Sequence, residues 1–489
     1  MDIMNEIKQR KLQSESVFAW FEKIASIPHG SGNTKQISDF LVSFAKERNL
    51  EYYQDEWNNV VMIKEAYAGY ETQEPVILQG HMDMVCEKES SCRKDLSKEG
   101  LSLYVEGDFL KADKTTLGAD DGIAVAMALA LLDADHIAHP RLEIVVTVDE
   151  EIGLLGAAKI DLSMLRSHQM LNLDSEEWGH FLTGCAGGMS VYTNIPVEYV
   201  ERSGLKCNVK ISGLFGGHSG SEIDKERANA DILLGRLFKT LTDRMEIGIA
   251  GFYGGNKDNA IPRESSAALF IAKGDKEAFL ETIETFSSVL KKEYVVSDPQ
   301  ISVTAEVIGE QQGEVLSVSS MAKVIFYLCT VPNGVQHMSQ NMKSLVETSL
   351  NLGIMELKKE SFYAAASVRS SVSTRKEQLR EKLEFLAEFL GGSVEVRGDY
   401  PAWEYRENSV VRDKIGRVFE RLFEEAPVFE TIHAGLECGV LSEKIKDLDC
   451  VSFGPDIFDA HTPAEKISIS STEKLWSLLL SFLKERHGS

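Results

Sequence analysis

Short apolar runs alternate with amphipathic stretches along the first third of the chain. Apolar residues recur at helical spacing between residues 15 and 50, which predicts amphipathic helices. The apolar runs 75–80, 142–148 and 170–173 are short and predict buried strands. The almost wholly apolar stretch 118–133 predicts a buried helix that covers a sheet. This alternation of strand and helix favours an α/β fold with a mainly parallel sheet.

The pattern changes after Asp174. Strand-like and helical stretches then alternate without the short buried runs of the first part, which favours an α+β arrangement. The strands expected there are 206–211 and 266–271, and the helices are 227–243, 275–292, 315–330 and 375–391. Short apolar strands return near the C-terminus, followed by a final amphipathic helix over 471–486.

Composition and charge narrow the class of protein. The chain has 76 acidic and 52 basic residues, and its net charge of -24 disfavours nucleic acid and anionic membranes as partners. Seven cysteines without a CxxC pair favour reduced thiols over a disulfide framework. No apolar signal-peptide core is present at the N-terminus, and no run approaches the ~18 apolar residues of a membrane span. We therefore expect a cytoplasmic protein.

Side chains of metal-ligand type stand where the expected strands give way to loops or helices. His81 follows the run 75–80, Asp120 opens the apolar helix, and Asp174 follows the run 170–173. His461 lies in Asp-Ala-His-Thr-Pro near the C-terminus. Ligands of α/β sheets gather at the carboxyl ends of strands. Histidine and carboxylate donors without cysteine indicate a hydrolytic metal site.

Two ions about 3.5–4 Å apart can share one carboxylate. Asp120 is the natural bridge, because the start of a helix favours an anion. His81, Asp174, Glu151 and His461 would then divide between the two ions. Asp83, two residues after His81 on an extended segment, can orient the imidazole.

The adjacent pair Glu150 and Glu151 closes the run 142–148. The two side chains point to opposite sides if the strand stays extended, whereas a turn would bring both inward. One would then be a ligand and the other a general base, and the residues alone do not choose which. A charged helix N-terminus is the competing interpretation of the pair. The joint occurrence of five ligand-type residues after apolar strands favours the metal site.

Two residues of the middle segment are candidates for substrate chemistry. His218 lies in Gly-Gly-His-Ser-Gly, which suits a loop histidine or an oxyanion donor that domain closure brings over the metal site. Arg369 is the only cation of a short strand-like stretch. It is either a solvated strand residue or a bidentate clamp for a substrate carboxylate.

A chain of 489 residues is expected to form more than one core. Because His461 must join His81, the catalytic domain must be discontinuous in sequence. We predict a catalytic domain of residues 1–186 and 399–489 and an inserted α+β lid domain of residues 187–398. Two related halves are an open alternative for the insert, although no repeat is legible in its sequence.

Six motifs resemble one known family over nearly the whole chain. They are Gly80-His-Met-Asp-Met-Val-Cys-Glu-Lys, Thr116-Leu-Gly-Ala-Asp-Asp-Gly, Asp149-Glu-Glu-Ile-Gly-Leu-Leu-Gly-Ala, Asn172-Leu-Asp-Ser-Glu-Glu, Phe215-Gly-Gly-His-Ser-Gly and His433-Ala-Gly-Leu-Glu-Cys-Gly. The family is that of the di-zinc metallopeptidases, which includes carboxypeptidase G-type enzymes and aminoacylases. The similarity is specific to its bacterial aminoacyl-histidine (Xaa-His) dipeptidase branch.

The resemblance implies roles that the residues alone leave open. It implies two Zn²⁺ per chain, with Co²⁺ or Mn²⁺ as substitutes. It implies ligands in two pairs around a shared carboxylate: His81 and Asp174 on one ion, Glu151 and His461 on the other, Asp120 between them. It implies the remaining roles as follows: Glu150 as general base, Asp83 as orienting residue, His218 and Arg369 on the lid.

The expected activity is hydrolysis of dipeptides, with Xaa-His (carnosine-like) dipeptides implied by the resemblance. The expected partner is the dipeptide, and a homodimer is compatible with the sequence. One alternative is an N-acyl amino acid amidohydrolase of the same family, which the long middle segment disfavours. A remote alternative is a non-catalytic peptide-binding relative, which should have lost Glu150 or a ligand, and neither is lost.

Overall fold

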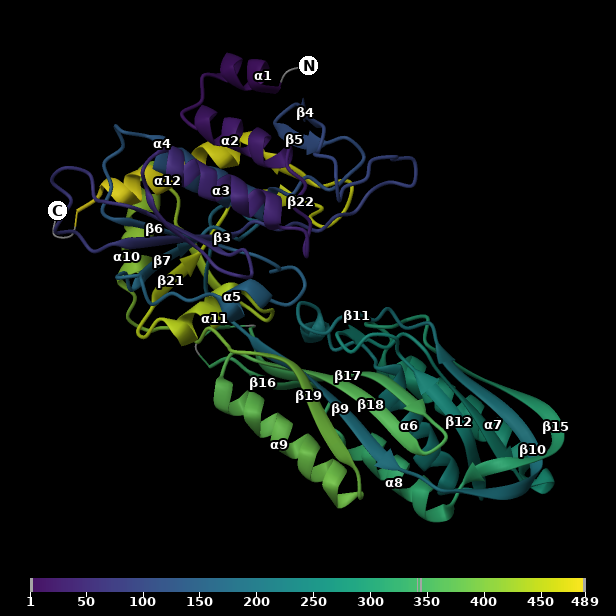
Figure 1. Cartoon of the computed structure of the whole chain (residues 1–489). Coiled ribbons are helices and arrows are strands. Elements are labelled where there is room, and N and C mark those ends of the chain that lie inside the picture. Colours follow the sequence, from purple (N-terminus) through teal and green to yellow (C-terminus); the bar gives the residue numbers. More distant parts are fainter. Residues whose placement is uncertain (1–2, 341, 344, 487–489) are drawn as a thin grey trace. The chain divides into compact units, whose positions relative to one another are not determined.

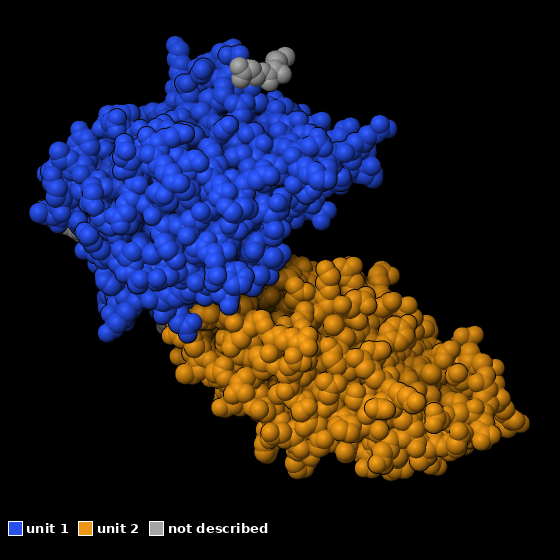
Figure 2. Space-filling view, viewed as in Figure 1, with its two compact units in different colours: residues 1–184, 405–431, 436–489 blue, residues 185–404, 432–435 orange. Residues whose placement is uncertain are grey.

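A computed structural model describes residues 3–340, 342–343 and 345–486 of the chain (Figure 1). The chain divides into two compact units, which are coloured separately in Figure 2. Unit 1 consists of Met1–Gly184, Tyr405–Thr431 and Leu436–Ser489, and unit 2 of Cys185–Glu404 and Ile432–Gly435. The two main boundaries thus follow residues 184 and 404, where the sequence analysis places them after 186 and 398. The short segment 432–435 belongs to unit 2, which no sequence pattern indicated.

An eight-stranded sheet forms the centre of unit 1, in the order β1-β2-β6-β3-β7-β21-β8-β20. Its strands are β1 (Glu51–Gln54), β2 (Val60–Lys64), β3 (Val76–His81), β6 (Leu142–Thr147), β7 (Gln169–Asn172), β8 (His180–Cys185), β20 (Val428–Ile432) and β21 (Asp449–Ser452). The central strands β6, β3, β7 and β21 are parallel. Every residue of β3 and β6 is buried, as expected for parallel strands that are covered on both faces. The predicted mainly parallel α/β fold is confirmed.

Eight helices accompany this sheet in the described part of unit 1: α1 (Ile3–Arg10), α2 (Glu15–Ala25), α3 (Lys35–Glu47), α4 (Ala119–Asp133), α5 (Leu155–Lys159), α10 (Val410–Phe423), α11 (Glu437–Lys444) and α12 (Ile469–Lys484). The apolar helix α4 packs against α2 and β3, and its side chains join one continuous core with those of the central strands. A separate four-stranded sheet contains β4 (Leu103–Glu106), β5 (Phe109–Ala112), β22 (Ile457–Phe458) and β23 (Lys466–Ser468). None of the described helices has the length and apolar character of a membrane span.

The start of α4 corrects one detail of the sequence analysis. Asp120 was expected in the first turn of a regular helix, but its backbone is extended (φ -81°, ψ 106°), and that of Asp121 is also non-helical. The regular helix therefore begins only after Asp121. Both carboxylates are consequently directed by the turn that precedes the helix and not by the helical repeat.

A nine-stranded sheet forms the centre of unit 2, and all its recorded pairings are antiparallel. Its strands are β9 (Gly187–Pro196), β10 (Tyr199–Ser212), β12 (Ile247–Gly254), β14 (Ser265–Ile271), β15 (Ser302–Leu316), β16 (Gly334–Met338), β17 (Val346–Leu357), β18 (Ser361–Ser370) and β19 (Ser393–Tyr400). The helices of this unit are α6 (Ala230–Thr242), α7 (Lys276–Glu293), α8 (Val318–Thr330) and α9 (Ser373–Phe389), with short 3₁₀ turns η1 (Ile223–Lys225) and η2 (Lys273–Asp275). A two-stranded ribbon pairs β11 (Gly217–His218) with β13 (Ala260–Ile261).

Unit 2 contains the same strand-helix topology twice. One half runs β10-α6-β12-β14-α7-β15, and the other runs β9-α8-β17-β18-α9-β19. The strand orders β15-β10-β14-β12 and β19-β9-β18-β17 are equivalent, and each corresponds to a βαββαβ unit. The halves join where Tyr253 and Gly254 of β12 pair with β17. The first half is inserted after β9 of the second, so the repeat is interrupted in the sequence and no linear period reveals it.

Candidate active site

Three predicted ligands of unit 1 lie together at the ends of neighbouring strands. His81 is the last residue of β3, and Asp174 lies just beyond the parallel strand β7. Nε2 of His81 lies 3.1 Å from Oδ1 of Asp120 and 3.9 Å from Oδ1 of Asp174. His81 is buried. The structure thus brings together the donors expected for one ion.

A second group shares Asp120. Nε2 of His461 lies 3.1 Å from Oδ2 of Asp120 and 2.9 Å from Oε1 of Glu151. Ligand atoms of these three residues all lie within 4.8 Å of one another. The two oxygens of Asp120 therefore face two different imidazoles, which is the arrangement that a carboxylate needs to bridge two ions.

The electrostatics of these residues fit divalent cations. Hydrogen bonds to Asp120 and Glu151 raise the pKa of His461 to about 11. Burial acts to lower the pKa of His81, but hydrogen bonds to Asp120 and Asp83 outweigh it and leave that pKa well raised. In the metal-free protein both imidazoles are thus protonated. Each proton takes the position between nitrogen and carboxylate oxygen that a cation would occupy. Histidine nitrogen and carboxylate oxygen are ligands that zinc and related ions accept.

The adjacent glutamates lie in a turn and not on the strand. β6 ends at Thr147, and the main-chain oxygen of Glu150 accepts hydrogen bonds from the N–H groups of Gly153 and Leu154. Side-chain oxygens of Glu150 and Glu151 both approach His81 within 4.8 Å. Of the two alternatives, the structure therefore shows the turn that directs both side chains inward. Burial raises the pKa of Glu150 to about 8, and nearby carboxylates add to the effect.

Asp83 connects the imidazole of His81 to the glutamate turn. Nδ1 of His81 donates to the main-chain oxygen of Asp83 at 2.9 Å and lies 3.4 Å from its carboxylate. The carboxylate accepts hydrogen bonds from Oγ of Ser31 at 2.8 Å and from the N–H of Glu150 at 3.1 Å. These contacts orient Nε2 of His81 toward Asp120. The main chain of Asp83 contributes to this as much as its side chain does.

Two carboxylates of the site were missed from the sequence. Oδ2 of Asp121 accepts the N–H of His81 at 3.1 Å, and its ligand atoms lie within 4.8 Å of His81 and Asp174. Glu465 accepts the three N–H groups of residues 117, 118 and 119 at 2.7, 3.1 and 2.8 Å. It holds the turn before Asp120. Of these two carboxylates, only Asp121 had a sequence signal, its position beside Asp120. Gly80 is related to it, because a Cβ on Gly80 would collide with Oδ2 of Asp121.

The predicted residues of unit 2 form a cluster of their own. Nδ1 of His218 accepts the N–H groups of Gly220 and Ser221 at 3.3 and 3.2 Å, so the ring proton is assigned to Nε2. Burial and the neighbouring Arg369 lower the pKa of His218. His218 is therefore a neutral imidazole with a donor at Nε2. That is the form an oxyanion donor requires.

The buried Asp298 and the partly exposed Glu222 hold the loop that carries His218. Asp298 accepts the N–H groups of Phe215 and Ala228 at 2.9 and 2.8 Å and so fixes both ends of the loop. Oε2 of Glu222 accepts the N–H of His218 at 3.0 Å. The position of the imidazole is thus determined by side chains outside the Gly-rich motif.

Arg369 lies on β18 and is 9% exposed. Its Nη1 donates to the hydroxyl of Tyr400 at 3.1 Å, whereas its buried Nε has no hydrogen-bond partner among the described residues. A Cβ added to Gly220 would lie 3.0 Å from the ring of His218 and 3.2 Å from Nε of Arg369. The two side chains therefore meet at Gly220. An unpartnered guanidinium N–H in this place fits a carboxylate ligand.

The motif that begins at His433 contributes to this cluster, although the sequence analysis gave its residues no role. Nε2 of His433 lies 2.7 Å from Oγ of Ser349 on β17. Burial and the charge of Arg369 lower the pKa of His433 to about 3, so the ring is neutral. A Cβ on Gly435 would lie 2.6 Å from the ring of Tyr400, so glycine is needed for this approach.

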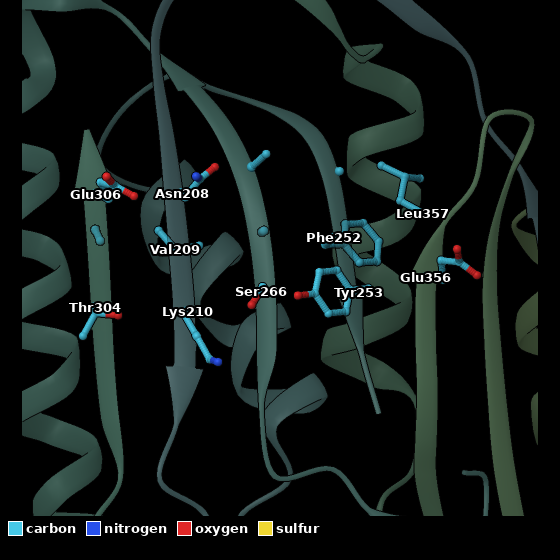
Figure 3. A pocket seen from close by; sticks show the side chains of 14 residues that line it. Asn208, Val209, Lys210, Phe252, Tyr253, Ser266, Thr304, Glu306, Glu356 and Leu357 are labelled. Atoms are coloured by element: carbon cyan, nitrogen blue, oxygen red, sulfur yellow. The ribbon is translucent and has the colours of Figure 1, made fainter. Parts of the chain in front are cut away.

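A broad depression lies elsewhere on unit 2, over β10, β12, β14, β15 and β17 (Figure 3). Small residues such as Ser266 and Ala268 are part of its lining, together with Tyr253, Lys210 and Glu306. It contains none of the predicted site residues and no histidine or cysteine. The depression therefore lacks the histidines that the predicted metal site needs.

Comparison with known proteins decides the family. The sequence pattern of the peptidase family M20/M25/M40 matches residues 77–485. The chain belongs to this family. A cytosol non-specific dipeptidase of Escherichia coli (strain K12) is 34% identical over 484 residues, which is 99% of each chain. The expectation of a metallopeptidase of this family is confirmed.

Two solved structures share the fold of this chain. The crystal structure of an aminoacylhistidine dipeptidase from Vibrio alginolyticus superimposes with a TM-score of 0.91 at 31% identity, and 97% of each chain is covered. The aminopeptidase PepT from Bacillus cereus ATCC 10987 gives a TM-score of 0.55 at 15% identity, which shows a shared fold alone.

Proposed function

We propose that this member of the M20/M25/M40 family is a metal-dependent dipeptidase with two Zn²⁺ per chain. The observation that carries the proposal is the position of Asp120, whose two oxygens each lie 3.1 Å from a different histidine. We assign His81 and Asp174 to one ion, Glu151 and His461 to the other, and Asp120 to both. Co²⁺ or Mn²⁺ fit the same oxygen and nitrogen donors and are proposed as substitutes.

When bound, the two ions would activate a water molecule and polarise the scissile carbonyl. Glu150 acts as the general base that takes a proton from the water and returns it to the leaving amine. Asp83 keeps the imidazole of His81 in the orientation that binding requires.

His218 and Arg369 are proposed to bind the substrate. Nε2–H of His218 donates to the oxyanion that forms at the scissile carbonyl. Arg369 binds the C-terminal carboxylate through the guanidinium edge that Tyr400 does not occupy. A carboxylate clamp at one end and a metal-bound scissile group at the other limit the substrate to a short peptide. That unit 2 is a lid that closes over unit 1 remains a proposal.

Dipeptides that end in histidine are the proposed substrates, because the Vibrio relative is an aminoacylhistidine dipeptidase. The name of the Escherichia coli relative supports a cytoplasmic location. We propose no role for nucleic acid or membrane, in line with the net charge of -24. A homodimer is compatible with the proposal but is not needed for it.

The decisive assay compares three substrate classes on zinc-reconstituted protein: Xaa-His dipeptides, Xaa-Gly dipeptides and N-acetyl amino acids. We expect both dipeptide classes to be cleaved, and Xaa-His fastest. Preference for N-acetyl amino acids would favour the amidohydrolase alternative. Absence of hydrolysis of all three by the zinc-loaded protein would favour a binding protein that keeps the fold.

A further inference from the structure

Glu437 is a buried carboxylate of unit 1 that the proposed mechanism does not use. It is the first residue of α11 and is 0% exposed. Its Oε2 accepts hydrogen bonds from Oγ1 of Thr147 at 2.6 Å and from Nε2 of Gln79 at 2.5 Å. Thr147 ends β6, before the glutamate turn, and Gln79 lies on β3 two residues before His81. Glu437 therefore contacts the two strands that deliver the central residues of the site.

The contacts extend to a third strand. Nδ2 of Asn172, the last residue of β7, donates to Oε1 of Gln79 at 2.5 Å. Asn172 precedes Asp174, so each of the three strands in this network leads directly to a proposed ligand. All four side chains of the network are buried. Asn172, Gln79, Thr147 and Oε2 of Glu437 are thus joined by direct hydrogen bonds.

The second oxygen of Glu437 has no such partner. Oε1 is buried and makes no hydrogen bond with any described residue. No lysine or arginine among these residues forms an ion pair with Glu437. Burial raises its pKa to about 7, although the nearby charge of His81 acts to lower it. A buried carboxylate without a counter-charge is destabilising, and buried charges in proteins are normally paired or associated with metals.

Glu143 on β6 shows how the same sheet treats a buried glutamate that has only a structural role. Nε of Arg141 donates to it at 2.9 Å, and the N–H groups of Arg166 and Ser167 donate at 3.0 Å. Both oxygens are satisfied and the charge is paired. The unpaired state of Glu437 is thus a local feature of the region next to the metal ligands.

We propose that Glu437 is a positioning residue of the metal centre, whose buried negative charge raises the affinity for divalent cations although it is not a ligand. The inference rests on the proposed dinuclear site. Charges interact over several ångströms in a medium of low dielectric constant. The ions would supply the positive charge that no lysine or arginine supplies. The same charge opposes folding of the metal-free protein and favours the metal-bound form.

Glu437→Gln tests this role, because the amide keeps the shape and an oxygen for Thr147 and Gln79 but removes the charge. We expect the Kd for Zn²⁺, measured by competition with a chromophoric chelator, to rise about tenfold or more, as for other outer residues of metal sites. The Tm of the metal-free variant should be unchanged or higher. Loss of a residue with a merely structural role would lower the Tm of the metal-free protein and would not raise the Kd for Zn²⁺ alone.

Glu143→Gln is the matched control. It should lower the Tm of the metal-free protein, because Arg141 loses a charged partner, and keep the wild-type Kd for Zn²⁺. Thr147→Val keeps the carboxyl group of Glu437 and removes one of its donors, so it should raise the Kd for Zn²⁺ less than Glu437→Gln does.

Three results would overturn the inference. The first is a wild-type Kd in Glu437→Gln, and the second is a metal-free Tm that falls as far as in Glu143→Gln. The third is a Thr147→Val variant whose Kd for Zn²⁺ rises about tenfold or more, a result that can be obtained even if Glu437→Gln does not fold. Failure of the wild-type protein to bind two ions would instead refute the proposed function.

Discussion

The two units treat buried acidic side chains in opposite ways. Unit 1 places the half-buried Asp120, Asp174 and Glu151 and the buried Glu437 near the ends of parallel strands, where His81 and His461 oppose them. Unit 2 buries Asp231 of α6 by itself, with the hydroxyl of Ser265 as its hydrogen-bond donor. A lone buried acid can remain neutral by holding its proton. A cluster of acids around two imidazoles is balanced by cations instead, which indicates that unit 1 is built around metal ions.

The units also differ in how they direct their functional side chains. In unit 1, strands β3, β6 and β7 end at one edge of the sheet, so strand order brings His81, the glutamate turn and Asp174 together. In unit 2, His218 lies on a loop that Asp298 and Glu222 hold, and Arg369 lies within an antiparallel strand. The metal centre is therefore determined by topology, whereas the cluster of unit 2 depends on individual hydrogen bonds.

The largest expected effect comes from the adjacent glutamates of unit 1. Glu150→Gln should retain two metal ions and lower kcat by at least about 10²-fold, the usual scale for loss of a general base. Glu151→Gln should instead weaken metal binding. Metal analysis and kcat of both variants check the assignment. The reverse pattern would show that the roles of the pair are exchanged.

His218→Ala tests whether unit 2 takes part in the chemistry. We expect kcat to fall about 10²–10³-fold with a smaller change in KM, because an oxyanion donor acts mainly in the transition state. Steady-state kinetics with a Xaa-His dipeptide measure both constants. His218 and Glu150 belong to one chain in this proposal. Recovery of activity on mixing His218→Ala with Glu150→Gln would show that His218 acts across a subunit interface.

Tyr400→Phe tests the carboxylate clamp more gently, because it removes the hydroxyl that accepts Nη1 of Arg369. We expect KM for a dipeptide with a free C-terminal carboxylate to rise several-fold, about 1 kcal/mol for one hydrogen bond. The same dipeptide as its C-terminal amide should show no change. Tyr363→Phe on β18 is the control. An equal change on both substrates would argue against a clamp at Arg369.

The smallest effect concerns stability and the lone acid of unit 2. Burial raises the pKa of Asp231 to about 8, so between pH 4 and 8 the folded state binds more protons than the unfolded state. Stability contributed by this group therefore falls as pH rises through that range. Asp231→Asn should remove this dependence of stability on pH. The change in the free energy of unfolding that it causes should be more favourable at pH 8 than at pH 5 by at least about 1 kcal/mol. Urea unfolding at both pH values measures it, and an equal effect at both would show that Asp231 is ionised when folded.

The elements of unit 1 were predictable because short apolar runs lead directly into polar motifs. β3, β6 and β7 end at most three residues before His81, Glu150 and Asp174 for that reason, and β3 ends at His81 itself. The roles of Glu437 and Tyr400 were not predictable, because their partners come from distant parts of the chain. The repeat of unit 2 was hidden in the same way, since one half interrupts the other after β9. Local pattern reveals strand ends, but not the contacts that form between them.

The central claim is that Asp120 bridges two ions in unit 1, and metal stoichiometry tests it most directly. Zinc-loaded protein that has been dialysed and retains dipeptidase activity should contain two ions per chain by elemental analysis. Asp120→Asn should lose affinity for both ions together, because each oxygen serves one of them. One ion or none in the active wild-type protein, or an Asp120→Asn variant that retains both with wild-type affinity, would contradict the account.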